Sequence, residues 1–334
     1  MEWIKPGTKI DFIGQRKYFF IASMTAIVLS LLSFLWPGAN WGIDFKGGTD
    51  IRVRFAKPTE IGQIRSVVES LNMGETQIQN MRPGIAESQK ENQDYLIRME
   101  LAGGEEQKEA VQSSKIITEK LTEKFGKDSF QVLSVDYVGP KVGNELKNRG
   151  IQALLYAMVG ILVYVAIRFE FAYALGAVLA VFHDVIISSG FYNLVHREWS
   201  LVIIAGLLTI IGYSVNDTIV IFDRVRENIK KARRGTLREI MNTSINETLS
   251  RTILTNFATT LAILLLAIFG NDVIRDFSIL MLFGMVVGTY STIYIASSLV
   301  LVYEDLRNRR TTREKITRAE KPEKAENTDK AKKP

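Results

Sequence analysis

Apolar residues along this chain gather into six long runs separated by polar segments. The runs cover residues 18–36, 151–167, 171–195, 201–222, 253–269 and 277–303. Each approaches or exceeds the roughly 17–25 residues that an α-helix needs to cross a bilayer. We therefore predict a polytopic α-helical membrane protein with six transmembrane helices, at 18–36, 150–167, 171–195, 201–222, 251–269 and 277–303. The first run is longer than the roughly 7–15 apolar residues of a signal peptide, so we expect an uncleaved anchor.

The polar segment between the first two runs, residues 37–149, is long enough to fold as a domain. Alternating apolar residues predict strands at 50–55, 75–81, 95–101 and 129–139, and helical spacing predicts helices at 59–72 and 110–125. Residues 83–94 are rich in turn formers and are expected to be a loop. The order β-α-β-β-α-β is that of a ferredoxin-like α+β domain.

The distribution of positive charge predicts the orientation of these spans. Basic residues precede the first run and crowd the connection at 223–250, whereas the short connections after 195 and 269 carry one arginine each. Because cytoplasmic loops are enriched in Lys and Arg, we expect 1–17, 223–250 and 304–334 inside and 37–149 outside. The net charge of +6 is then largely a matter of topology. The basic tail at 304–334 is expected to be disordered, and it lacks the aromatic residues of a nucleic-acid-binding segment.

The fourth run contains an acidic residue where lipid is expected. Asp217 lies six residues before Asp223, about 9 Å inside the cytoplasmic end of the span. A carboxylate at such a depth costs several kcal/mol unless water, a partner or a proton neutralises it. Such residues mark proton relays, but a neutral Asp217 that serves only as hydrogen-bonded glue between helices, for example to Asn256, remains an alternative.

Other polar residues fall near Asp217 if the fourth and fifth spans run antiparallel. Arg251, Thr255 and Asn256 open the fifth span, Asn216 is adjacent in sequence, and Arg224 shares the face of Asp217 two turns on. In the third span Asp184 lies near mid-membrane next to His183. We take Asp217 and Arg251 as the proton-relay candidates, with His183, Asp184, Asn216, Arg224, Thr255 and Asn256 as supporting polar residues.

Each supporting residue also has a simpler interpretation. Asp184 can equally pair with His183 or a serine, and Arg224 and Arg251 can act only as positive-inside anchors. No second His or Cys accompanies His183 at metal-ligand spacing, so we predict no metal site. The chain has no cysteine, and therefore no disulfide and no thiolate metal site. It also has no P-loop, no G-x-G-x-x-G after a strand and no Ser/His/Asp arrangement, which argues against an ATPase or a soluble-type enzyme, and we predict that it is not an enzyme. Protons are the only coupling ion expected, and no other cofactor.

Several longer motifs carry a family resemblance. They are "WGIDFKGGTDIRVRF" at 41–55, "VGPKVGNEL" at 138–146, "FHD" at 182–184, "GYSVNDTIVIFDRVREN" at 212–228 and "SRTILTN" at 250–256. With these motifs in order over about residues 10–305, the chain resembles the SecF side of the bacterial SecD/SecF family of protein-export membrane proteins, which is related to the resistance-nodulation-division exporters.

The resemblance implies an accessory subunit of the Sec translocase in the bacterial inner membrane. It implies that the chain acts with SecD and near the SecYEG channel, and that proton flow is coupled to movement of external domains that draw out an unfolded preprotein. It also implies that Asp217 and Arg251 take part in proton transport. Two alternatives stay open at this point, a passive structural subunit of the translocon and a proton-coupled small-molecule exporter.

Overall fold

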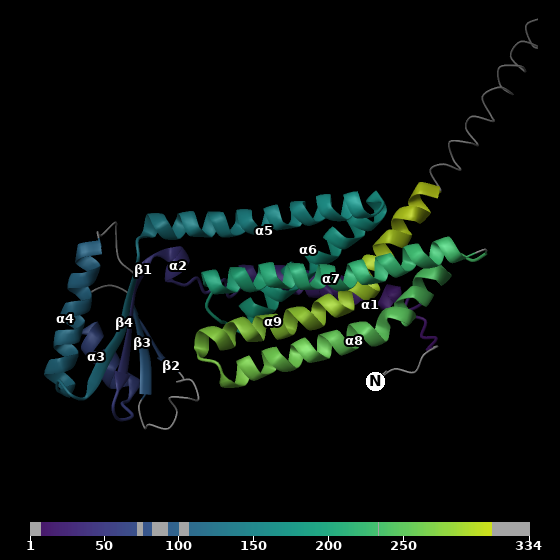
Figure 1. Cartoon of the computed structure of the whole chain (residues 1–334). Helices are drawn as coiled ribbons and strands as arrows, with labels where there is room; N and C mark the ends of the chain where they lie inside the picture. Colours follow the sequence, from purple (N-terminus) through teal and green to yellow (C-terminus); the bar gives the residue numbers. More distant parts are fainter. Residues whose placement is uncertain (1–7, 72–75, 82–92, 100–106, 233, 309–334) are drawn as a thin grey trace, which may run out of the picture.

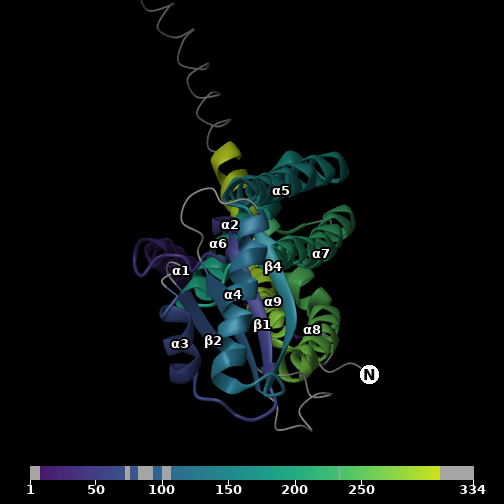
Figure 2. The same cartoon turned by 90° about the vertical axis from the view of Figure 1, so that its left-hand side faces the viewer.

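The computed structural model describes residues 8–71, 76–81, 93–99, 107–232 and 234–308, and for residues 107–111 it describes the backbone only. It has two parts: a bundle of long helices, and a small α/β domain at one end of that bundle (Figure 1). Viewed from that end, the sheet and its two helices stand in front of the bundle (Figure 2).

Six helices in the described chain are long and apolar enough to cross a membrane, as the six runs predict. They are α1 (Arg16–Leu35), α5 (Pro140–Arg168), α6 (Phe171–Leu194), α7 (Leu201–Lys231), α8 (Leu237–Phe269) and a last helix over Asp272–Asn308. This last helix contains α9 (Asp272–Ser291) and the π-helical turn η1 (Thr292–Ala296).

Several of these helices extend well beyond the apolar runs. α5 begins ten residues before the predicted 150, where Pro140 occupies the first helical turn. The connection predicted at 223–250 is largely helical, because α7 continues to Lys231 and α8 already begins at Leu237 behind a capping box formed by Thr236 and Glu239. The last helix reaches Asn308, past the predicted tail boundary at 304. The rest of the predicted tail, 309–334, and most of the predicted loop at 83–94 lie outside the described residues.

The domain between α1 and α5, here called the external domain after the side of the membrane on which it is expected, has the predicted β-α-β-β-α-β order. Its elements are β1 (Gly48–Phe55), α3 (Ile61–Glu69), β2 (Thr76–Met81), β3 (Gln93–Met99), α4 (Gln107–Phe125) and β4 (Phe130–Val138). The strands pair antiparallel in the order β2-β3-β1-β4, so the first strand lies between the third and the fourth. A single short helix, α2 (Ile43–Lys46), precedes β1.

The two faces of this sheet have different roles. Ile51, Val53 and Phe55 of β1 are buried in one cluster with α3 and α4 residues such as Ile64 and Leu121. The intervening side chains of β1 and β3 point to the opposite face, which is polar and turned toward the bundle. The alternation that marks these strands in the sequence therefore separates a hydrophobic core from a charged junction.

Candidate functional site

The first polar cluster of the bundle is centred on Asp217, in the middle of α7. Its side chain is buried, and its Oδ2 accepts a hydrogen bond from Asn256 Nδ2 of α8 at 2.9 Å. The same amide donates to Thr289 Oγ1 of α9 at 2.6 Å, and its oxygen accepts from the hydroxyl of Tyr213 at 2.6 Å. Three helices therefore meet at Asn256, and this bond confirms that Asp217 and Asn256 lie at the same depth.

Asp217 keeps unused hydrogen-bonding capacity. Within the described residues the Asn256 amide is its one hydrogen-bond donor, and its Oδ1 has no such partner. A carboxylate offers about four acceptor sites, whereas a protonated carboxyl group can donate one hydrogen bond and accept others. The single hydrogen bond holds the side chain in place but leaves most acceptor sites of an ionised carboxylate unoccupied. The side chain can therefore bind a proton.

A second polar cluster surrounds Asp184 of α6, which is completely buried. Asp184 Oδ2 accepts hydrogen bonds from Ser214 Oγ of α7 at 2.6 Å and from Ser291 Oγ of α9 at 2.7 Å. Its Oδ1 lies 2.8 Å from His183 Nδ1. In contrast to Asp217, this carboxyl group has both oxygens in use.

His183 extends this cluster toward the first helix. Its Nε2 lies 2.9 Å from Ser23 Oγ of α1, and Ser23 is in turn hydrogen-bonded to the hydroxyl of Tyr290. With one ring nitrogen on a carboxylate and the other on a hydroxyl, His183 is an interior residue with both ring nitrogens hydrogen-bonded. In the described part of the chain no group of three or more His, Cys, Asp or Glu side chains could hold a metal ion.

Two helices carry members of both clusters. Ser214 and Asp217 are about one turn apart on α7, and Thr289 and Ser291 lie two residues apart on α9. The π-helical turn begins at the next residue, Thr292, whose hydroxyl lies 3.0 Å from that of Thr218. π-helical turns are frequent at functional sites, and this one places an irregular segment of the last helix next to the two clusters.

Three of the predicted site residues lie at the surface of the bundle rather than in either cluster. Asn216, Arg251 and Thr255 are exposed on α7 and α8. Arg251 is close enough to Asp217 to act on it through its charge, but it makes no hydrogen bond or ion pair within the described residues. The relay pair suggested by the sequence is therefore near but not in contact.

Arg224 serves another purpose. Although it shares a helix face with Asp217, its guanidinium group pairs with Glu227 and with Glu247 of α8, each at 2.6 Å. It therefore ties together the extended ends of α7 and α8.

Sequence reasoning missed the hydroxyl groups that bind Asp184 and Asn256. Serine and threonine are common in transmembrane helices, so Thr289, Ser291 and Ser214 did not stand out. The available signal was the pair Gly284 and Gly288, since a side chain on Gly284 would collide with Ile210 of α7 and one on Gly288 would lie within 3.2 Å of Ser214. Their small size lets α9 approach α7 closely enough for these hydroxyls to reach Asp184 and Asn256.

Comparison with known proteins relates this arrangement to membrane proteins of protein export. The family model described as "Protein export membrane protein SecD/SecF, C-terminal" matches residues 117–306, and the "SecD/SecF GG Motif" matches residues 37–59. A relative named protein translocase subunit SecF from Calditerrivibrio nitroreducens is 45% identical over 311 residues, covering 92% of this chain and 99% of the relative. The SecF subunit of Magnetococcus marinus is 42% identical over 304 residues, covering 91% and 95%.

Solved structures agree with these matches. The crystal structure of SecDF from Thermus thermophilus, described as a translocon-associated membrane protein, superposes with a TM-score of 0.76 at 34% identity and covers 90% of this chain and 39% of that one. SecDF in a super-membrane-facing form gives a TM-score of 0.67, also at 34% identity, covering 94% and 41%. The chain thus spans about two fifths of the SecDF chains and nearly the whole length of its SecF relatives. It is a multi-pass membrane protein and belongs to the SecD/SecF family of protein-export membrane proteins.

Proposed function

We propose that this chain is the SecF-type subunit of a bacterial protein translocase and that, with a SecD-type partner, it uses the proton motive force to promote preprotein translocation across the cytoplasmic membrane. The names of its relatives support the translocase assignment. Proton coupling is supported by one observation above the others. Asp217 is a buried carboxyl group in the middle of a membrane-spanning helix, and its one hydrogen-bond donor in the described chain is an amide.

The small number of hydrogen-bond donors to Asp217 favours binding and release of a proton at this side chain. In a low-dielectric interior an ionised carboxylate with a single donor is unstable, so it gains from binding a proton or from the approach of a positive charge. Arg251 is exposed and unpaired within the described residues, five residues before Asn256 on the same helix. A small shift of α8 against α7 would bring its guanidinium group to Asp217 and release the proton.

A partner in the membrane is supported by the polar surface beside Asp217. Asn216, Arg251 and Thr255 are exposed on α7 and α8, and such side chains are costly when they face lipid. The chain corresponds to about two fifths of SecDF, in which the remaining part belongs to the same polypeptide. A SecD-type partner that covers this face would bury these groups and complete the proton path.

The proposed location is the bacterial inner membrane with both termini in the cytoplasm. The described N-terminal residues and the basic ends of α7 and α8 lie at the same end of the bundle, opposite the external domain (Figure 1). That end carries Arg226, Lys230, Lys231, Arg234 and Arg238, as expected of a cytoplasmic face. We further propose that the protein is not an enzyme, that it needs no cofactor except protons, and that the SecYEG channel and the unfolded preprotein are its other partners.

The test of proton coupling is the variant Asp217→Asn, which keeps the shape of the side chain but cannot carry a proton. In inverted membrane vesicles that contain the translocase, we expect its preprotein translocation to fall to the level that wild-type vesicles show with an uncoupler. The matched control is Asp223→Asn on the same helix, where the carboxylate is exposed and pairs with Arg168 at 3.5 Å. This control should keep full uncoupler-sensitive translocation.

Variants of Arg251 complete the test. Arg251→Met should impair coupling while Asp217 is intact, and Arg251→Lys should retain part of it because the positive charge remains. All variants should still co-purify with the SecD-type partner. A passive structural subunit predicts instead that Asp217→Asn translocates normally, with and without the uncoupler, and that result would refute the proton assignment.

A further inference from the structure

The external domain meets the bundle at residues 195–200, the short connection between α6 and α7. The backbone of Gly42 donates to Trp199 O at 2.8 Å, and Trp199 N donates to Asn40 O at 2.8 Å. Residues 41 and 199 thus form a parallel β-bridge. The segment that leads from α1 into the external domain is therefore paired directly with the segment that leads into α7.

Asp44 of α2 caps the first turn of α7. Its Oδ2 accepts a hydrogen bond from Leu201 N at 2.8 Å, and Ser200, the residue at the N-cap position, provides no side-chain cap of its own. The first amides of a helix lack intrahelical partners and carry the positive end of the helix dipole, so a carboxylate there is stabilising. In this protein that carboxylate comes from the external segment.

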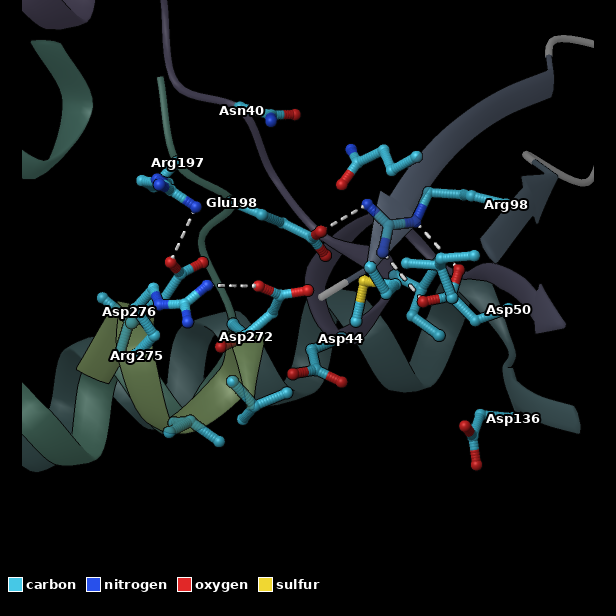
Figure 3. Close-up of a pocket in the computed structure, with 18 of the residues that line it drawn as sticks. Asn40, Asp44, Asp50, Arg98, Asp136, Arg197, Glu198, Asp272, Arg275 and Asp276 are labelled. Carbon is cyan, nitrogen blue, oxygen red and sulfur yellow. Dashed lines mark hydrogen bonds and ion pairs between the residues drawn. The ribbon is translucent and has the colours of Figure 1, made fainter. Parts of the chain in front are cut away.

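A second link is made by Arg98 of β3. Its guanidinium group forms two hydrogen bonds with Asp50 of β1, at 2.9 and 2.8 Å, and an ion pair with Glu198 at 2.7 Å (Figure 3). The side chain of Arg98 is only 7% exposed, so these bonds are shielded from water. Burial alone would lower the pKa of Arg98, but the hydrogen bonds to Asp50 and Glu198 outweigh it and raise that pKa. The arginine is therefore firmly charged.

The fit around these links is tight. A side chain on Gly42 would meet Glu198 Oε1 at 2.2 Å, and one on Gly143 of α5 would meet the backbone of α2 at 3.0 Å. Gly47, between α2 and β1, has a φ of 82° and would bring a side chain within 2.7 Å of Pro140 Cα. These glycines let α2 pack closely against α5 and against residues 195–200. A movement of the external domain should therefore also displace residues 195–200.

α7 continues from this junction to both carboxyl clusters. It is one α-helix from Leu201 through Ser214 and Asp217 to Lys231. Asp217 lies 16 residues after Leu201, or about 24 Å along the helix axis. A packed helix moves as a rigid element, so a displacement of its first turn reaches the environment of Asp217.

We propose that Asp44 and Arg98 are positioning residues through which the external domain holds the first turn of α7, so that the position of this domain and the proton occupancy of Asp217 are energetically coupled. The inference rests on the proposed function only for the role of Asp217. It assigns the coupling to two side chains outside the membrane and to one helix. Since coupling between two sites is reciprocal, loosening the hold at Leu201 must change the proton affinity of Asp217.

The test compares Asp44→Ala with Asp44→Asn in the full chain in lipid nanodiscs. Both substitutions remove the charge, but only asparagine keeps an oxygen that can accept from Leu201 N. Amide hydrogen exchange of residues 201–204 should become about fivefold faster in Asp44→Ala and change less in Asp44→Asn, because one helix cap is lost. Titration of Asp217 is followed by its carboxyl infrared band, identified as the band that is missing in Asp217→Asn.

We expect Asp44→Ala to change the proton affinity of Asp217 at least about fivefold, the lower end of typical coupling, and Asp44→Asn to change it by less than half as much on a logarithmic scale. The direct field of Asp44 cannot account for a difference between the two variants, because both substitutions remove the same charge. Glu198→Leu, which removes the link to Arg98 and leaves the cap in place, should also shift the titration. The control Glu145→Gln on the exposed face of α5 should not.

An unchanged titration in Asp44→Ala and Glu198→Leu would overturn the proposal, as would equal shifts in Asp44→Ala and Asp44→Asn. Unchanged exchange of residues 201–204 in Asp44→Ala would overturn it as well, because the cap would then not hold the helix. The measurement uses neither preprotein nor a proton gradient. A failure of the translocation test with the coupling intact would therefore count against the proposed function alone.

Discussion

The two buried carboxyl groups of the bundle differ in how completely their oxygens are satisfied. Asp184 lies among two serine hydroxyls, one from α7 and one from α9, and the imidazole of His183 on its own helix α6. Asp217 has one amide donor within the described chain. A fully coordinated carboxyl group resists a change of state, whereas an incompletely coordinated one can exchange a proton. At this scale the structure favours a structural role for Asp184 and a titrating role for Asp217.

This difference predicts unequal losses of stability when each carboxyl group is removed. Asp184→Ala removes the acceptor of Ser214 and the partner of His183 Nδ1, whereas Ser291 keeps the carbonyl of Gly288 as an acceptor. It should lower the free energy of unfolding by about 2 kcal/mol or more, since each unsatisfied buried group costs about 1–3 kcal/mol. Asp217→Ala removes only one hydrogen bond of Asn256 and should cost about half as much. Thermal unfolding of both variants in nanodiscs measures the contrast. Equal losses would show that the hydrogen-bond count does not distinguish the two sites.

At the scale of elements, the extended ends of α7 and α8 form a platform beyond the apolar runs. The turn between the end of α7 and the start of α8 is stabilised by the capping box at Thr236 and by the ion pairs of Arg224. The start of α8 also holds the described N-terminal segment. Asn242 Oδ1 accepts from the amides of Phe12 and Ile13, and its Nδ2 donates to Ile10 O, all within 3.2 Å. A single side chain therefore fixes three backbone groups.

We predict that Asn242→Ala releases this segment. Loss of its hydrogen bonds to the amides of Phe12 and Ile13, worth about 0.5–1.5 kcal/mol each, should accelerate their exchange about tenfold, whereas the amide of Ile10, which Asn246 holds, should change less. The matched control is Thr243→Ala, since Thr243 is exposed beside it and makes no hydrogen bond within the described residues. Exchange that is equally slow in both variants would mean that packing of Phe12 and Ile13 alone holds the segment.

Much of this architecture could be predicted from apolar periodicity. Runs of membrane-spanning length and the alternation in Ile51, Val53 and Phe55 are direct consequences of burial, so they identify the helices and the sheet. Helix ends beyond the runs could not be placed, because capping and ion pairs between α7 and α8 depend on which helices are neighbours. Asp217 could be identified as a candidate, because it is an acidic residue in an apolar run. Its lack of contact with Arg251 and the hydroxyl groups around Asp184 depend on which helices are neighbours, so only the structure shows them.

At the scale of the whole molecule, polar groups are distributed unevenly over the membrane part. α1, α5 and α8 are peripheral, and many of their exposed side chains are large and apolar, such as Val159 and Tyr164 of α5. The α7–α8 face is different, because Asn216, Arg251 and Thr255 are exposed there at the level of Asp217. An apolar face is stable against lipid, whereas this polar face requires protein, and we therefore expect the SecD-type partner to cover it.

The last prediction follows from this asymmetry and uses the absence of cysteine from the sequence. A single cysteine at Asn216 or Thr255 should cross-link to cysteines introduced into the membrane helices of the SecD-type partner, because both positions lie in the covered face. A cysteine at Val159, which is 57% exposed on the apolar α5, should remain open to lipid-soluble reagents and should not cross-link. Cross-links at Val159 but not at Asn216 would place the partner on the opposite side. In that case the polar face beside Asp217 would have to be hydrated rather than covered, and the proton would reach Asp217 through water in this chain rather than through an interface.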